Sequence, residues 1–412
     1  MLSGVYMRLC FGILFSIFSF KLLANDSSSQ CAVKSYVDIV KCIEEKSYKN
    51  KVYDYKLKSA RSIKSASEQW INPELGLEKI AKDSEKSETS ASLLFTLRLG
   101  GKKGALMDEA ESLFQKESIQ IGMDKKNSRL DSILNLYRLS HLKREIEIED
   151  ETIKTFSKVI NQFKRPKLSP EQEVSLSIFK MAIADHEIKI IDLKSDEELL
   201  YAKIASLSGL PKAEIEKYLP AQKRDWPEYK LSQDVENLQT IKLAEADLKL
   251  AKSQLEKAKS DAWPDLRIGP SFKQTQVGDE KENFVGAALV MPLPIFNLNG
   301  NLKQAETHRL EAAQLEYENS KIQALNLKNS MTAKYNALVA VLKKSLSNKS
   351  VDDNHLKTEK QFFSGLVSGA LVIEAHRQFV DFEERRNSAE LQAIETLGKL
   401  YILEQKFDGV VL

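Results

Sequence analysis

The sequence predicts a mainly α-helical protein with a membrane-spanning β component. Long stretches of the 412-residue chain space their apolar residues as helices do, with few Gly or Pro to interrupt them. Two blocks, 65–104 and 259–301, resemble each other, and each contains two segments of alternating apolar and polar residues. We therefore expect long coiled-coil helices that carry four strands in each chain.

Composition argues against disorder and against nucleic-acid binding. The chain is 42% hydrophobic and 29% charged, with 16 Gly and 10 Pro, a balance typical of long amphipathic helices. Its formal net charge of +2 offers no basic field for nucleic acid. The His residues lack metal-ligand spacing, and no Ser-His-Asp set or phosphate loop is recognisable. We predict neither an enzyme nor a cofactor.

Residues 1–24 are interpreted as a signal peptide. Arg8 precedes an apolar run over 9–20, and Ala24 offers a small residue for cleavage before Asn25. The run has about a dozen residues, short of the roughly 20 that span a bilayer. An uncleaved anchor is the alternative. No later stretch reaches the roughly 18 apolar residues of a membrane helix, so entry into a membrane would use strands.

Cys31 and Cys42 follow the signal segment, and in an oxidising compartment they could pair. We expect one helix from 31 to about 69, since this stretch is charged and free of Pro and Gly. On one continuous helix the two residues would lie about 16 Å apart along the axis. That separation is too long for a disulfide, so the pattern favours free thiols.

The first structural repeat, 25–208, continues with a β-hairpin over 71–99 and a helical hairpin. Leu75 and Leu77 alternate with polar residues in its first strand, as Phe95 and Leu97 do in its second. A helical pattern then runs from Gly104 to about Gln162, about 85 Å at 1.5 Å per residue. Two prolines after it predict a reversal, and a second helix returns to about 207.

Residues 209–230 contain three prolines and predict an irregular linker with a short helix over 212–218. The second repeat, 231–412, begins with a helix over 231–258 and a β-hairpin over 264–292. Helices follow over 299–346 and to about 404, with breaks expected near 347–353 and 365–369. The first of these helices has a heptad seam: Ile241, Ala244, Leu248, Ala251, Leu255 and Ala258.

Four strands of roughly ten residues can cross a bilayer but cannot close a barrel. An open sheet in lipid would leave its edge amide groups unpaired, at a cost of several kcal/mol each. Several copies must therefore share one barrel, and three copies would supply twelve strands. The long helices would continue beneath that barrel as the wall of a hollow tube.

Four motifs stand at the junctions of strands and helices: Asn72-Pro73-Glu74-Leu75, Leu99-Gly100-Gly101-Lys102-Lys103-Gly104, Trp263-Pro264-Asp265-Leu266 and Pro292-Leu293-Pro294-Ile295-Phe296-Asn297. In this order and spacing the chain resembles the TolC family of outer-membrane efflux ducts, particularly its CzcC/CusC-type branch linked to cation efflux. The resemblance implies a homotrimer with a 12-stranded barrel in the outer membrane of a Gram-negative bacterium and a periplasmic α-barrel. It also implies two partners: a periplasmic adaptor (a membrane fusion protein) and an inner-membrane pump of the RND type or another type.

The family's two periplasmic helix-turn tips match 161–173 and 362–376, and the linker 209–230 matches its equatorial region. The resemblance implies that the tips dock the adaptor, through Lys167, Leu168, Ser169, Gly365, Leu366, Val367 and Ser368. Pro166 stands where the family usually has Gly. The family often carries acidic residues just past the tips, where they line the closed entrance. The candidates here are Glu374, Glu171 and Glu173.

These features predict a passive duct for solutes. The likeness to the cation-efflux branch favours heavy-metal cations as the solute, and drugs are the other solute class. Two other functions stay open. One is a duct for type I protein secretion, and the other is a periplasmic coiled-coil scaffold without a pore. A scaffold would not need two lipid-length alternating hairpins, which is why the duct is favoured.

Overall fold

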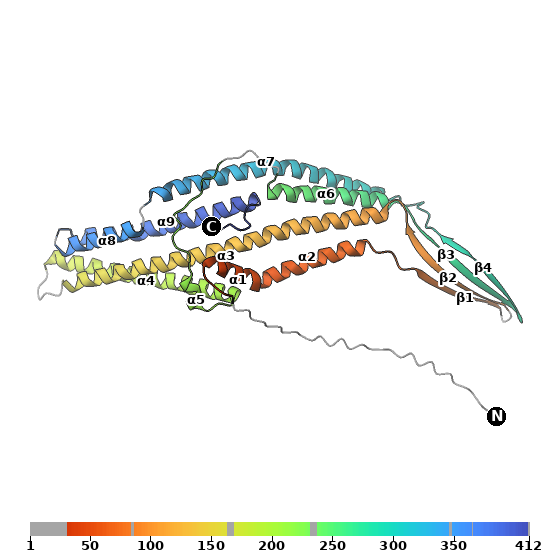
Figure 1. Ribbon diagram of the computed structural model, residues 1–412, viewed down its shortest axis with the longest axis horizontal. Coiled ribbons are helices and arrows are strands. Elements are labelled where there is room, and N and C mark those ends of the chain that lie inside the picture. The colour runs from red at the N-terminus through yellow and green to blue at the C-terminus, as the bar shows by residue number, and fades with distance from the viewer. Residues whose placement is uncertain are drawn as a thin grey trace, which may run out of the picture.

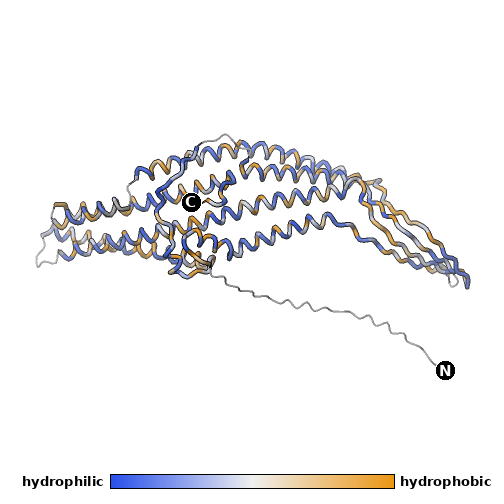
Figure 2. The backbone as a smooth tube through the Cα atoms, viewed as in Figure 1, coloured by the Kyte–Doolittle hydropathy of each residue, from blue (hydrophilic) through white to orange (hydrophobic). Residues whose placement is uncertain are grey.

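A computed structural model describes residues 31–83, 86–162, 169–230, 237–345, 348–364 and 366–410. The molecule is long and narrow, with a helical body that carries a β-sheet at one end (Figure 1). Hydrophilic and hydrophobic residues alternate along the helices, and the hairpin tips are hydrophilic (Figure 2). Within these residues, no helix combines the length and the apolar content needed to cross a bilayer. The predicted signal peptide lies outside the described residues.

Four antiparallel strands form one sheet in the order β1-β2-β3-β4. Their bounds are Glu74–Asp83, Lys86–Arg98, Asp265–Val277 and Glu280–Val290. The two hairpins are far apart in sequence, and β2 and β3 join them, with Phe95 opposite Ile268. Among the described residues, β1 and β4 each pair on one side only. The four strands expected from alternation are therefore present, and they leave two open edges.

The helices next to the sheet repeat this side-by-side order (Figure 1). The helix α2 (Tyr48–Ser67) packs on α3 (Lys102–Gln162), α3 packs on α6 (Gln239–Ser260), and α6 packs on α7 (Gly300–Lys344). Four residues of the predicted heptad seam of α6 are buried, Ile241, Ala251, Leu255 and Ala258, whereas Ala244 and Leu248 are half-buried. Ala246 and Leu250 are also buried, because α6 packs between two helices. The small alanines allow close approach of the neighbouring helices.

At the far end, α3 continues between α4 (Pro170–Ser208) and α9 (Gly369–Leu403), and α8 (Asn348–Phe363) packs on α9. With 61 residues, α3 is about 90 Å long and links the two ends of the molecule. The break that we expected over 347–353 is shorter, since α7 ends at Lys344 and α8 begins at Asn348. Ser345 leaves the helix with extended backbone, at ψ 152°.

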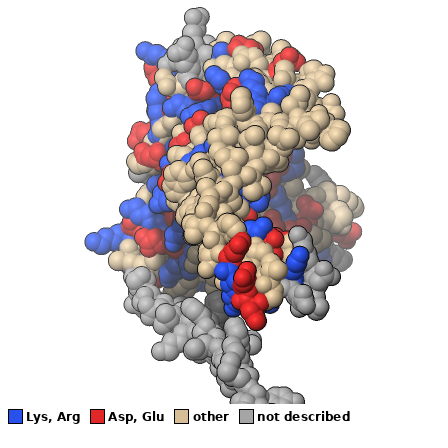
Figure 3. Space-filling model, turned by 90° about the vertical axis from the view of Figure 1, so that its right-hand side faces the viewer, with Lys and Arg blue, Asp and Glu red and all other residues tan. Residues whose placement is uncertain are grey.

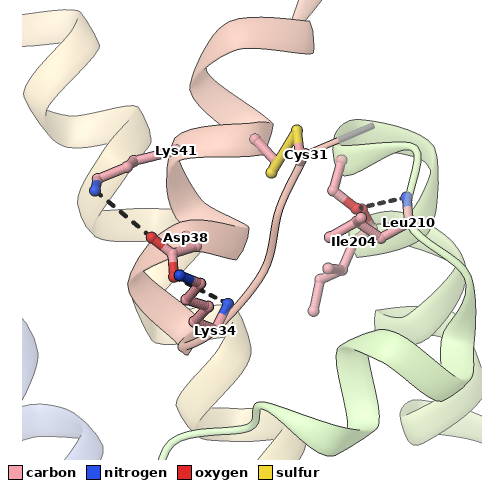
Figure 4. Close-up of a disulfide and its surroundings, with 8 residues drawn as sticks. Cys31, Lys34, Asp38, Lys41, Ile204 and Leu210 are labelled. Carbon is pink, nitrogen blue, oxygen red and sulfur yellow. Dashed lines mark hydrogen bonds and ion pairs between the residues drawn. A yellow bond between two sulfur atoms is a disulfide. The ribbon is translucent and has the colours of Figure 1, made fainter. Parts of the chain in front are cut away.

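The expected helix over 31–69 is wrong, and so is the expectation of free thiols. The structure has α1 (Tyr36–Lys46) and α2, separated at Ser47. Before α1 the chain turns, because the Asp38 carboxylate accepts hydrogen bonds from the Lys34 amide and the Ser35 hydroxyl. This turn places Cys31 beside Cys42, at a Cα–Cα distance of 6.0 Å, and the two form a disulfide (Figure 4).

The largest apolar core lies midway along the molecule, where residues 209–230 wrap the long helices. There α5 (Lys212–Lys217) buries Ile215 completely, and α3 contributes Leu136 and Leu139. Trp226 and Tyr335 pack edge to face with ring centroids 6.4 Å apart. The Tyr335 hydroxyl donates to the Pro227 carbonyl at 2.8 Å, so the irregular segment is held by both apolar packing and hydrogen bonds.

Candidate functional site

The sheet has one apolar face and one face that carries paired charges. The strand register places these side chains on the apolar face: Leu75, Leu77, Ala91, Leu93, Phe95, Leu97, Leu266, Ile268, Phe272, Val285, Ala287 and Leu289. Toward the hairpin tips this face becomes polar, at Thr89, Gln274 and Asn283. Figure 3 views the molecule from the sheet end and shows a broad uncharged band that ends in a cluster of charges, with further charges beside the band. Such a band matches the lipid-facing side of a membrane sheet.

The opposite face contains most of the charged side chains of the strands. Arg267 donates to Glu74 at 3.1 Å, and the Lys273 ammonium lies 2.7 Å from Glu88. Small residues occur between these pairs, among them Gly269, where a Cβ added by substitution would stand 1.8 Å from the Leu93 carbonyl oxygen of β2. Exposed pairs of this kind contribute little stability, but they make the face compatible with water.

Two helices of the body carry apolar stripes that no described element covers. On α2 the exposed residues Tyr48, Val52, Tyr55 and Ile63 recur at spacings of three, four or eight residues, on the side turned away from the buried Tyr53. Exposed Leu315 and Ile322 lie seven residues apart on α7. Heptad-like stripes of this kind are typical of helix–helix contacts. The open edges of the sheet therefore continue as open edges of the helical body.

The two edge helices differ in charge near the sheet. The α2 sequence has six basic residues and only one acidic residue, Asp54. The first half of α7 has four acidic residues, of which Glu306 is buried, against Lys303, Arg309 and Lys321. A basic α2 edge beside the exposed Glu311, Glu316 and Glu318 of an α7 edge is compatible with a contact between copies.

An exposed apolar stripe also lies on α4, toward the end of the molecule that is remote from the sheet. Its residues are Val174, Ile178, Met181 and Ile188, at spacings of four, three and seven. This end of the molecule is called the tip, and inside it Phe156, Val159, Phe179 and Val372 form a small buried core. The Phe156 and Phe179 rings pack edge to face at 5.4 Å. The tip thus has its own core beneath an uncovered apolar stripe.

The candidate docking residues fall at the turns of this tip. Ser169 begins α4 with a capping box, in which its hydroxyl accepts from the Gln172 amide and its own amide donates to the Gln172 side chain. Ser368 caps α9 by accepting from the Leu371 amide. Leu366 is 74% exposed, whereas Val367 packs on the tip core. Lys167, Leu168 and Gly365 lie outside the described residues.

Glu374 lies one turn into α9, and its charge is paired within the helix. Arg377 donates to both of its carboxylate oxygens, at 2.7 and 2.9 Å, and Gln378 donates at 2.9 Å. These bonds from Arg377 and then Gln378 lower the pKa of Glu374 to about 2. Glu173 is an exposed residue of the first turn of α4, and Glu171 also lies in that turn, with its side chain outside the described part.

A buried charged cluster between the tip and the middle of the molecule has no counterpart among the sequence-predicted sites. Glu149 of α3 is 1% exposed and contacts His186 and Lys189 of α4. Lys189 also reaches Glu384 of α9 at 2.6 Å, so three helices meet at these charges. The described His, Cys, Asp and Glu residues form no group of three or more that could hold a metal ion.

Solved structures of outer-membrane channels have the same architecture. A CusC structure is 13% identical, with 89% of this chain and 91% of that chain covered and a TM-score of 0.67. VceC from Vibrio cholerae is 16% identical, with 90% and 97% covered and a TM-score of 0.65. The open state of the MtrE channel of Neisseria gonorrhoeae is 15% identical, with 91% of each chain covered and a TM-score of 0.65.

This chain has the TolC-like fold. The predicted fold class, long helices with a four-stranded sheet, is therefore confirmed. No protein-family model matches the sequence, and no curated protein matches it. At 13–16% identity the likeness extends to the fold and not to the solute or the partners of those channels.

Proposed function

We propose that this protein is a homotrimeric outer-membrane duct that passively conducts solutes from the periplasm to the exterior. One observation carries the proposal: a four-stranded sheet has a continuous apolar face and two open edges. In lipid, such edges must be paired, and three copies would close a 12-stranded barrel of ordinary size. The apolar face would meet outer-membrane lipid, and the charged face would line a water-filled lumen.

Closure of the trimer would use the same two edges on every copy. A head-to-tail contact places β4 of one copy beside β1 of the next, and a ring results when the rotation closes. The same rotation brings α7 of one copy, with its exposed Glu311, Glu316 and Glu318, beside the basic α2 of the next. The sheet and the helical body thus require the same neighbour, which supports a closed tube.

The tip would form the periplasmic entrance of the duct. Glu374, Glu171 and Glu173 lie at the starts of the tip helices, where a ring of three copies would gather their charges. We propose that a periplasmic adaptor docks at the tip turns and that an inner-membrane pump, of the RND type or another type, provides energy and selection. Opening would then need only small rotations of packed helices, and the chain would perform no catalytic step.

For the solute, we propose heavy-metal cations, on the sequence likeness of the strand–helix corners to the cation-efflux branch. Deleting the gene should lower the tolerance of the cells to such cations. Unchanged tolerance to metals combined with lower tolerance to drugs would assign the duct to drug efflux instead. Either outcome leaves the duct itself intact, because a passive tube needs no solute-specific site.

The test of the duct uses two neighbouring residues on opposite faces of β4. Leu289 lies on the apolar face and Ala288 on the charged face. Leu289→Lys should block insertion into the outer membrane, because a lysine facing the lipid midplane costs about 2–4 kcal/mol. Ala288→Lys should insert normally and shift the ion selectivity of single channels in planar bilayers toward anions. Equal insertion of both variants would contradict the assignment of the faces.

A further inference from the structure

A short apolar loop projects from the corner between β4 and α7. This loop, Leu293–Leu298, is called the hook here. Its four large apolar side chains are exposed: Leu293 66%, Ile295 69%, Phe296 101% and Leu298 61%. A fully exposed phenylalanine flanked by three exposed aliphatic residues is costly in water and usually marks a contact surface. No described residue of the same chain covers it.

The hook is held in one conformation by its own backbone. Pro294 within the hook and Pro292 just before it restrict its backbone, and the Ile295 amide donates to the Leu293 carbonyl at 2.9 Å. At its base, Asn299 has φ 59°, and its side chain donates to the Ala258 carbonyl at 2.9 Å. A loop fixed in this way loses little conformational entropy on docking, as expected of a preformed binding element.

A small pocket of matching size lies at the opposite edge of the same chain. It occupies about 160 Å³ where α2 leads into β1 and is lined by Trp70, Ile71, Leu97 and Lys103, among others. The Lys103 ammonium lies 3.9 Å from the centre of the Trp70 ring and supports this wall. A cavity of about 150 Å³ suffices to hold a benzene molecule, so a phenyl ring fits this volume.

We infer that Phe296 of one copy inserts into the Trp70–Ile71 pocket of the neighbouring copy. The inference rests on the proposed trimer, in which β4 pairs with β1 of the next chain. The hook follows the end of β4 at Val290, and the pocket precedes the start of β1 at Glu74. Antiparallel pairing brings these two ends together, so each edge of the chain supplies one half of the contact.

This contact would lock the seam where the barrel meets the helices. At that level the strands end and their hydrogen bonds cease, so side chains must hold neighbouring copies together. Three identical hook contacts would form around one trimer. The pocket is open on the isolated chain and would be complete only when the neighbour supplies Phe296.

The direct test is a cysteine pair in the full-length protein in outer membranes. Phe296→Cys combined with Ile71→Cys should give a covalent trimer on mild oxidation, and the native cysteines do not interfere because they are already joined. The control pairs Val285→Cys with Ile71→Cys. Val285 is 85% exposed in β4, the strand that precedes the hook, and it lies five residues before the end of that strand. The variant with this control pair should therefore stay monomeric on denaturing gels.

A second variant removes the anchor without adding a new bond. Phe296→Ala should raise the rate at which detergent-extracted trimers dissociate at least tenfold, whereas Val285→Ala should not change it. A trimer by native mass whose 296–71 pair crosslinks no more than the control would overturn the hook and leave the duct intact. Monomers under all conditions would overturn the hook and the duct together.

Discussion

Replacing Lys328 by Met should loosen the C-terminal end of α9 where it meets the middle of α7. The Lys328 side chain is 2% exposed, and its ammonium lies 2.9 Å from the carboxylate of Glu404, which is 10% exposed. Lys406 reaches the other carboxylate oxygen at 2.8 Å. The variant removes one partner and leaves a buried carboxylate with incomplete compensation.

The size of the effect follows from the carboxyl group. Burial by itself raises the pKa of Glu404, but hydrogen bonds from Lys406, Tyr229 and Lys328 bring it down from 4.5 to about 2. At about 1.4 kcal/mol per pKa unit, this shift corresponds to about 3 kcal/mol of stabilisation by all the partners together. Because the folded pKa is depressed, the stabilisation is present above about pH 4.5 and is lost as the pH falls toward 2.

Loss of Lys328 alone should cost about 1–2 kcal/mol, since Lys406 and Tyr229 remain as partners of Glu404. Amide hydrogen exchange at pH 7 in residues 397–404 of the purified protein should then accelerate roughly 5- to 30-fold. Lys321→Met is the matched control on the same helix, because Lys321 is 39% exposed and contacts Glu318 and Tyr317 at the surface. Equal exchange in the two variants would refute the buried-pair reasoning.

Three further perturbations test other parts of the structure. Removing the disulfide with Cys31→Ser and Cys42→Ser opens a short loop, which should cost up to about 3 kcal/mol and lower the melting temperature of the helical body; an unchanged melt would show that the link is dispensable. Glu374→Lys should alter closed-state conductance or adaptor docking without loss of trimers, and unchanged conductance and efflux would remove Glu374 from the entrance. Gly269→Val should abolish barrel assembly, because a Cβ there would stand 1.8 Å from a backbone carbonyl, whereas Gly286→Ala, with 3.5 Å to its nearest neighbour, should assemble; normal assembly of the valine variant would contradict the pairing of β2 with β3.

The strands and long helices were predictable because their signals are local. Alternation over β2 and β3 and the heptad seam of α6 each depend on residues a few positions apart. The disulfide was not predictable in this way. Its formation depends on a chain reversal before α1, which a single carboxylate, Asp38, fixes through two hydrogen bonds to residues three and four positions earlier. Helix propensity alone does not predict such a turn.

The residues of the candidate site also divide into contacts that the local sequence predicts and contacts that depend on the packing of separate helices. The pairing of Glu374 with Arg377 is an i, i+3 contact and is visible in the sequence. The cluster of Glu149, His186 and Lys189 is not visible, because these residues meet only once α3 and α4 are aligned in one register. The same holds for the hook and its pocket, which lie at opposite edges of the chain and whose relation depends on how copies assemble.

Electron microscopy of the full-length protein, extracted from outer membranes in detergent, tests the central claim most directly. The account predicts a threefold hollow tube over roughly 100 Å long, since α3 alone contributes about 90 Å of its wall. A monomer or a solid rod recovered from the soluble periplasmic fraction would contradict it.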